Sequence, residues 1–185
     1  MKTIGLIGGM SWESTLHYYE GLNTGIKQRL GGLHSAHLMM ESLDFAPIEA
    51  LMREGKWESI EEILASSALR LEKAGAQGIV LCTNTMHKLA PIIEEVTRVP
   101  LLHIAKSTAQ AIKEETMDEV ILLGTRFTME QDFYTSILED QGIRAHIPDA
   151  KGCKEVDRII FEELCLGAIL PSSKARYHST THAIT

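Results

Sequence analysis

Short apolar runs alternate with longer segments of helical periodicity along this chain, and glycine turns separate many of them. Thr3–Ile7 is a short apolar run that a Gly-Gly pair closes, and Gly78–Cys82 is another such run. Trp57–Ala74 instead carries its apolar side chains at helical spacing, and a glycine ends it. Strands that alternate with helices of this length predict an α/β fold of βαβ units, with right-handed crossovers and a parallel sheet.

The same two periodicities predict the remaining elements. Further strands are expected over residues 34–45, 100–104, 119–123 and 143–147. Further helices are expected up to residue 30 and over residues 86–96, 107–115, 128–141 and 155–166. The periodicity ends after Pro171, and we expect residues 178–185 to form an irregular tail.

Two segments of the chain resemble each other. Thr3–Leu16 and Glu119–Phe133 each combine an apolar strand, a glycine turn and a helix start with an acidic residue. This repeat suggests that one strand, turn and helix unit occurs twice in the chain, whose length suits one domain or two small ones. The first domain is expected over residues 1–115, where it carries Cys82, and the second over residues 116–177.

The repeat also predicts where a second cysteine would lie. Cys82 follows the turn glycine Gly8 of the first copy, and the matching glycine of the second copy is Gly124. If the same spacing applies in the second copy, its cysteine would lie near position ~198. That position lies beyond Thr185, the last residue of the sequence. We therefore expect the second domain to be incomplete and its cysteine to be missing, as in a truncated second half.

The composition limits the function classes. Over 185 residues the formal net charge is −7, which argues against a nucleic-acid backbone as the main partner. No apolar run approaches the roughly 20 residues of a membrane span and no signal peptide is visible, so no membrane partner is expected. Three cysteines without CxxC spacing argue against a disulfide framework or a zinc site, and they favour a cytoplasmic location.

Cys82 is the strongest candidate for chemistry, because it lies where a predicted buried strand meets a helix. In an open parallel sheet, ligands bind beyond the carboxyl ends of the strands. Backbone N–H groups and the dipole of a following helix would favour its thiolate. Thr83, Asn84 and Thr85 add hydroxyls, an amide and turn-forming backbone, which suit a carboxylate better than a phosphate. The alternative is that Cys82 only fills apolar space.

Two further turns are expected at the same edge of a sheet. Gly8–Ser11 ends the first strand, and its adjacent glycines let the backbone approach a ligand closely. A tight strand-to-helix turn explains these glycines equally well, and the segment does not match the dinucleotide-binding pattern. Thr125 and Arg126 hold the matching place in the second copy.

The other candidate side chains have more ordinary explanations. His87 and His103 lie near strand ends, where a histidine is more often a capping or packing residue than a base. Cys153 is expected to be exposed and Cys165 to belong to the core. Arg53 and Arg126 could pair with a distal carboxylate of a substrate, although a surface role is as plausible.

Five motifs, in this order, resemble the aspartate/glutamate racemase family. They are GGMSWEST, DF at Asp44-Phe45, GIVLCTNTMH, LLGTRFTMEQDFY and IIFEELCLG. The resemblance runs from Met1 to about Tyr177. It implies two similar α/β domains with the active site in the cleft between them, a small-molecule amino-acid substrate and no cofactor. It also implies a homodimer, since family members are commonly dimers.

The same resemblance implies a racemase mechanism with one cysteine on each face of the substrate Cα. One thiolate removes the Cα proton while a thiol on the other face delivers a new one. Cys82 would serve one face, and the matching residues for holding the substrate carboxylates are Met10, Ser11, Thr83, Asn84, Thr85 and Thr125. The family's second motif, G-C-T-E, does not occur in the sequence, so we expect racemisation by this chain to be impaired or lost.

Two other functions stay open. A single-cysteine enzyme of the same superfamily, such as a decarboxylase or an isomerase, would need only Cys82 to protonate one face. A non-catalytic module would keep the carboxylate site without turnover. Inversion of the substrate would favour the racemase, whereas saturable binding without exchange at Cα would favour the module. The identity of the amino acid is not determined by these motifs.

Overall fold

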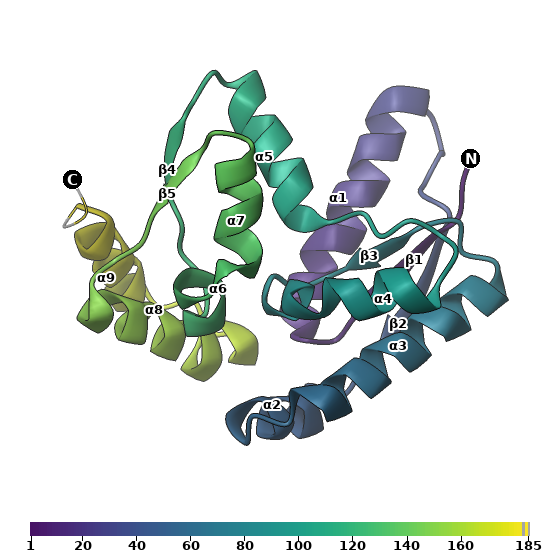
Figure 1. The fold of residues 1–185 in the computed structure, drawn as a ribbon. Helices are drawn as coiled ribbons and strands as arrows, with labels where there is room; N and C mark the ends of the chain where they lie inside the picture. The colour runs from purple at the N-terminus through teal and green to yellow at the C-terminus, as the bar shows by residue number, and fades with distance from the viewer. Residues whose placement is uncertain (183, 185) are drawn as a thin grey trace. The chain divides into compact units, whose positions relative to one another are not determined.

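The computed structural model describes residues 1–182 and 184 and shows two compact units, Met1–His103 and Ile104–Thr185 (Figure 1). Each unit contains parallel strands that are connected through helices, which confirms the predicted α/β class. Within the described residues, no helix combines the length and the apolar content that crossing a bilayer requires.

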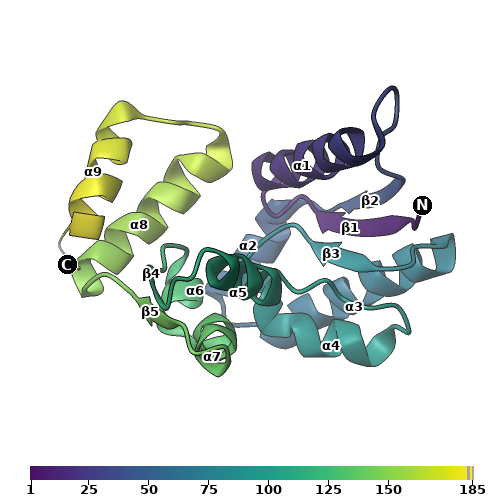
Figure 2. The same cartoon turned by 90° about the horizontal axis from the view of Figure 1, so that it is seen from above.

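The first unit is a parallel sheet between two layers of helices. Its elements are β1 (Ile4–Gly8), α1 (Trp12–Leu30), β2 (Leu38–Ser42), α2 (Phe45–Arg53), α3 (Trp57–Ala74), β3 (Ile79–Leu81), the 3₁₀ helix η1 (Thr85–Leu89) and α4 (Ala90–Val96). The strand order is β2-β1-β3. Figure 2 shows α1 on one face of this sheet and α3 and α4 on the other. Leu6 and Ile7 point to opposite faces and are both fully buried, so β1 is covered on both sides.

The second unit has a smaller parallel sheet. Its elements are α5 (Ile104–Glu114), β4 (Glu119–Ile121), α6 (Arg126–Glu130), α7 (Asp132–Asp140), β5 (Arg144–His146), α8 (Ala150–Glu162), the 3₁₀ helix η2 (Leu164–Leu166) and α9 (Pro171–His182). Strands β4 and β5 pair in parallel. Buried side chains of α5 and α7 form one apolar cluster of this unit, against which Val120 and Leu122 pack. A second cluster joins Met129 to Cys153 and Val156 of α8.

The predicted internal repeat has a structural counterpart in the two turns that follow β1 and β4. A Cβ atom on Gly8 would lie 2.5 Å from Thr15 Cγ2, and one on Gly124 would lie 3.0 Å from Thr128 Cβ. In both units, therefore, a glycine ends the strand segment because a threonine of the next helix packs against it. The order strand, helix, strand, helix then recurs in both units.

Several predicted boundaries are corrected by tertiary contacts. Helix α5, which was assigned to the first domain, belongs to the second unit, because Ala105, Ala109 and Ile112 pack with side chains of α7. In place of the strand predicted over residues 100–104 there is only a single β-bridge between Ile79 and Leu101. The last residue of that range, Ile104, is already the first residue of α5. The helix predicted over residues 128–141 is interrupted at Gln131, whose backbone is extended.

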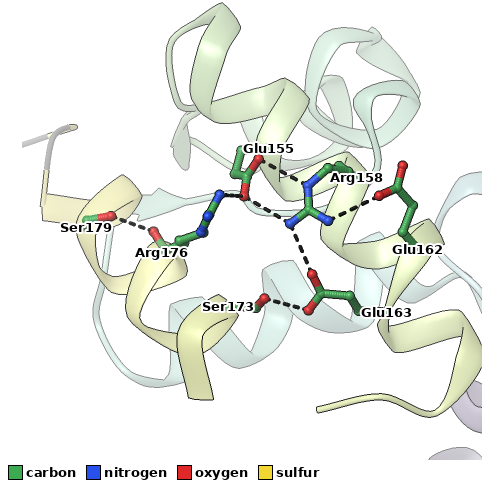
Figure 3. A network of polar contacts seen from close by, with 7 residues as sticks. All are labelled: Glu155, Arg158, Glu162, Glu163, Ser173, Arg176 and Ser179. Carbon is green, nitrogen blue, oxygen red and sulfur yellow. Dashed lines mark hydrogen bonds and ion pairs between the residues drawn. The ribbon is translucent and has the colours of Figure 1, made fainter. Parts of the chain in front are cut away.

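The prediction of an irregular tail over residues 178–185 is wrong for residues 178–182, which belong to α9. The prediction for residues 183 and 185 lies outside the described residues. Helix α9 is polar, so it left no apolar period in the sequence. Two polar contacts tie α9 to the α8 segment: Arg176 pairs with Glu155, and Ser173 donates to Glu163. Figure 3 shows them beside the pairs of Arg158 with Glu155, Glu162 and Glu163, which lie within the α8 segment itself. Tyr177 of α9 also packs against the apolar cluster around Met129, Cys153 and Val156.

We expect acid to release α9 from α8. Arg158, and to a lesser extent Arg176, lowers the pKa of Glu155 to about 2, and Ser173 followed by Arg158 lowers the pKa of Glu163. A carboxylate with a lowered pKa stabilises the folded state above its ordinary pKa near ~4.3, and this stabilisation is lost as the pH falls toward the folded value. Between pH ~4.5 and ~2, amide NMR signals of α9 should therefore shift before those of β1. Glu155→Gln should remove the part of this sensitivity that comes from the Arg176–Glu155 pair, whereas the part from the Ser173–Glu163 contact should remain. Signals of α9 that stay unchanged to pH ~2 in the unmodified protein would contradict the expectation.

Candidate active site

The turn after β1 is held by one threonine side chain. Thr15 Oγ1 accepts a hydrogen bond from the Gly9 N–H (2.9 Å) and donates one to the Ser11 carbonyl (3.0 Å). The Gly8 carbonyl accepts a hydrogen bond from the Leu43 N–H (3.0 Å), which ties the turn to the segment after β2. Met10 and Ser11 are both buried in this turn. The first candidate carboxylate-binding segment is therefore rigidly placed by its own hydrogen bonds.

Cys82 lies beside this turn, as the sequence predicts. Its N–H donates to the Ile7 carbonyl (2.9 Å), because β1 and β3 pair in parallel. Its carbonyl accepts a hydrogen bond from the Ser14 hydroxyl of α1 (3.1 Å). The structure thus brings Met10, Ser11 and Cys82 together at the carboxyl ends of two adjacent strands.

The environment of the Cys82 side chain differs from the expectation. The side chain is 0% exposed and clusters with Leu6 and Val80 on the sheet face that α1 covers. Burial raises the pKa of the Cys82 thiol to about 12, whereas a following helix was expected to favour the thiolate. The helix that follows is the short 3₁₀ helix η1, which begins only at Thr85 and has a small dipole. Cys82 is therefore a neutral thiol at neutral pH.

This environment predicts slow alkylation of Cys82. With a pKa of about 12, the thiolate fraction at pH 8 is roughly a thousandfold below that of an ordinary cysteine. Iodoacetamide should therefore modify the half-buried Cys165 well before Cys82 in the folded chain. Peptide mass spectrometry measures the order, and the urea-unfolded chain, in which all three cysteines should react alike, is the control. Faster modification of Cys82 than of Cys165 would show that the thiol is activated.

The three residues after Cys82 lie in the turn into η1. Thr83 and Thr85 are buried, whereas Asn84 is exposed. The Asn84 carbonyl accepts a hydrogen bond from the His87 N–H (3.0 Å). The His87 ring contacts the Thr83 carbonyl through Nδ1 (2.8 Å), so His87 has the capping role that was favoured over that of a base.

Thr125 belongs to the second unit, where it caps α6. Its hydroxyl oxygen accepts a hydrogen bond from the Thr128 N–H (3.4 Å) and lies 3.2 Å from the Thr128 hydroxyl. The two candidate arginines are already engaged in ion pairs with neighbours on their own helices. Arg126 forms a bidentate pair with Glu130 (2.8 and 2.9 Å), and Arg53 pairs with Glu49. These pairs favour the surface role for both arginines.

Cys153 and Cys165 do not lie where they were expected. Cys153 is buried in α8 instead of exposed, and its thiol donates to the Pro148 carbonyl (3.3 Å). Burial, followed by the nearby Glu130, raises the pKa of Cys153. Cys165 is half-buried in η2 and not part of the core. Cys153 is thus a packing residue, because it faces the cluster around Met129 and Val156.

Three residues of α1 were missed by the sequence reasoning. Ser14 holds the Cys82 carbonyl and Thr15 holds the turn, as described above. Glu13 has one buried carboxylate oxygen that finds no hydrogen-bond partner within the described residues. The available signal was the run of polar residues, WEST, in the first turn of a helix that follows a Gly-Gly turn.

Comparison with known proteins supports a family assignment. Residues 7–185 match the family model described as Asp/Glu/Hydantoin racemase. The chain belongs to this racemase family. The resemblance that the sequence motifs suggested is thereby confirmed over nearly the whole chain.

Individual family relatives agree with the assignment. A Yersinia pestis protein of known structure, provisionally assigned as an Asp/Glu racemase, is 49% identical, with a TM-score of 0.88 over 100% of this chain and 80% of that one. An aspartate racemase homologue from Pyrococcus horikoshii is 35% identical, with a TM-score of 0.77 over 91% of this chain and 74% of that one. The broad specificity amino-acid racemase RacX of Bacillus subtilis is 28% identical over 142 residues. That alignment covers 75% of this chain, and the chain spans 61% of the length of RacX.

Proposed function

We propose that this protein is a cofactor-independent amino-acid racemase in which Cys82 transfers a proton at one face of the substrate Cα. The observation that carries the proposal is the placement of Cys82 beside the turn that contains Met10 and Ser11, at the carboxyl ends of β1 and β3. Family membership supports the reaction class. The names of the relatives support an amino acid as the substrate.

The proposed reaction moves two protons and leaves the protein unchanged overall. In one direction a thiolate takes the Cα proton, and the C–H electron pair delocalises into the substrate carboxylate. An acid on the opposite face then protonates Cα, which inverts the configuration. In the other direction the two groups exchange roles. Cys82 is one of the two groups, and by family resemblance the opposing group is a second thiol. Because the G-C-T-E motif that carries this thiol in the family does not occur in the sequence, we propose that racemisation by this chain is impaired.

The raised pKa of the Cys82 thiol suits the direction of the reaction in which Cys82 donates a proton to Cα. A neutral Cys82 is ready to donate a proton to a carbanion. For the opposite direction the thiolate must be favoured after the substrate binds, and the α-ammonium group of an amino acid supplies a positive charge for this. Substrate binding and activation of the thiol are therefore coupled in the proposal.

The carboxylate groups of the substrate would be held by backbone N–H groups and hydroxyls. The residues proposed for this role are Met10, Ser11, Thr83, Asn84, Thr85 and Thr125. The buried turn around Met10 and Ser11 supports the assignment, because a preorganised donor costs little entropy when it binds an anion. Pairing of Arg53 and Arg126 with their own helix neighbours leaves neutral donors as the favoured carboxylate ligands.

Chiral chromatography tests the proposed function. The purified chain is incubated with an L-amino-acid panel that includes aspartate, glutamate and neutral amino acids. The proposal predicts slow formation of the D-isomer of at least one of them, because the motif of the second cysteine does not occur in the sequence. If no member of the panel is inverted by a folded sample, the chain is not a racemase for these amino acids.

A single-cysteine enzyme is the second candidate, and the neutral state of Cys82 favours it. A decarboxylase needs an acid that protonates a carbanion from one side, and it needs no base at the other face. Release of carbon dioxide without inversion would support this candidate over the racemase.

We also propose a cytoplasmic homodimer. Within the described residues none of the three cysteines forms a disulfide, which agrees with a reducing compartment. On α1, Trp12, Leu16 and Tyr19 follow one another at helical spacing and are each about half exposed, which supports self-association through this helix. Light scattering coupled to size-exclusion chromatography measures the oligomeric state, and a monomer at all concentrations would contradict the dimer.

A further inference from the structure

We infer that His87 is a positioning residue, which fixes the turn that carries Cys82 and orients a backbone donor for the substrate carboxylate. The inference rests on the proposed function of Cys82 and extends it to a side chain that needs no contact with the substrate. Four observations carry it: the hydrogen bonds of His87, its burial, its contact with His103 and the geometry of the peptide that it holds.

Two hydrogen bonds from His87 close the turn after Cys82. The His87 ring Nδ1 lies 2.8 Å from the Thr83 carbonyl oxygen. A carbonyl oxygen only accepts, so Nδ1 carries the hydrogen and donates it. The His87 backbone N–H donates to the Asn84 carbonyl (3.0 Å). One residue thus holds both carbonyl groups that directly follow Cys82 in the chain.

The hydrogen bond to the Thr83 carbonyl also fixes the direction of the Asn84 N–H group, which belongs to the same peptide. In a trans peptide the C=O and the following N–H point in opposite directions. Because the Thr83 carbonyl points at the His87 ring, the Asn84 N–H points away from that ring. Asn84 is exposed, whereas His87 is only 2% exposed. The ring therefore sets the direction of an N–H group that belongs to the proposed carboxylate-binding segment.

The ring itself is held in place by a second histidine. The centroids of the His87 and His103 rings are 4.5 Å apart, with an angle of 59° between the ring planes. His103 is buried and directly follows Leu102, whose N–H donates to the Ile79 carbonyl (2.8 Å). The histidine pair thus connects the turn after β3 to the backbone at the start of β3.

The charge state of His87 agrees with a positioning role. Burial, followed by the nearby His103, lowers the pKa of His87 to about 4, although the backbone contacts with Thr83 and Asn84 oppose this shift. The ring is therefore neutral over the physiological pH range, and its Nδ1–H donor persists there. A histidine that stays neutral and donates to a carbonyl serves structure better than proton transfer at neutral pH.

Two substitutions separate the hydrogen bond from the packing of the ring. His87→Leu fills similar space but removes the donor. His87→Asn keeps an amide N–H at the reach of Nδ1, and it is the matched rescue variant. For Cα hydrogen exchange we expect kcat/KM to fall by about 100-fold in His87→Leu, with contributions from both kcat and KM, because a displaced turn misplaces the thiol and the carboxylate donor. His87→Asn should stay within about fivefold of the unmodified protein.

Amide and imidazole NMR test the inference independently of activity. In the unmodified protein, long-range ¹⁵N–¹H spectra should show His87 as the neutral Nδ1–H tautomer. In His87→Leu, the amide signals of Cys82 and Asn84 should shift strongly, whereas those of Leu6 should not, and His87→Asn should restore most of the original positions. A different tautomer, or equal shifts in both variants, would overturn the inference, as would unchanged kcat/KM in a folded His87→Leu. Failure of the proposed function would look different, because the unmodified protein itself would then show no Cα hydrogen exchange. The NMR signals of the His87 ring and of the Cys82 and Asn84 amides would still decide whether His87 positions the turn.

Discussion

Replacement of Cys82 by serine should reduce Cα hydrogen exchange by about a thousandfold or more, because proton transfer by a positioned group contributes up to roughly 10⁴-fold. A serine hydroxyl is a much weaker acid than a thiol, so it neither forms the base nor donates a proton with comparable ease. The side chain is fully buried beside Leu6 and Val80, and serine is nearly isosteric with cysteine. The fold should therefore survive while the chemistry is lost.

The matched control for this substitution is Cys165→Ser, which changes a half-buried thiol in η2 of the other unit. That variant should exchange at the rate of the unmodified protein. Circular dichroism and urea unfolding establish that both variants are folded. Exchange by Cys82→Ser within about tenfold of the unmodified rate would remove Cys82 from the mechanism.

Replacement of Gly9 by alanine should destabilise the protein by about 3 kcal/mol or more. Gly9 has a φ of +88°, a backbone conformation that an L-residue adopts only with strain. A Cβ atom there would also collide with the backbone of Leu43, which cannot move away as a flexible side chain could. The turn that holds Met10 and Ser11 would have to shift, so binding of the substrate should weaken as well.

Gly55→Ala is the matched control, since Gly55 has a φ of +70° and nothing within 4 Å of the added Cβ. Only the backbone cost of about 1 kcal/mol should appear there. Urea unfolding measures both free energies. If the two substitutions cost the same, steric contact with Leu43 is not what fixes the glycine turn.

The central sheet and the proximity of Cys82 to the turn after β1 could be predicted because they depend on local pattern. The uninterrupted apolar runs that became β1 and β3 must be covered on both faces, and this requirement fixes parallel strands between helices. The carboxyl ends of these adjacent strands then bring Cys82 to the turn that contains Ser11.

The features that the sequence did not reveal depend on contacts between distant residues. Helix α9 contacts α8 largely through polar groups, the Arg176–Glu155 ion pair and the Ser173–Glu163 hydrogen bond, so it has no apolar period to detect. The unit boundary falls before α5 because that helix packs on α7, which local spacing cannot show. The pKa of Cys82 depends on the cover that α1 provides over its sheet face, and a sequence position near a helix start does not determine this.

The most direct test of the account is proton NMR of amino acids incubated with the purified chain in D₂O. We expect the Cα–H signal of at least one amino acid of the panel to disappear with time, and this loss to depend on Cys82. The account requires only that the Cys82 thiol exchange a proton with Cα, so exchange without inversion would still support it. A folded sample that binds the amino acid but leaves its Cα–H signal intact would contradict it, and would leave a carboxylate-binding protein of racemase ancestry.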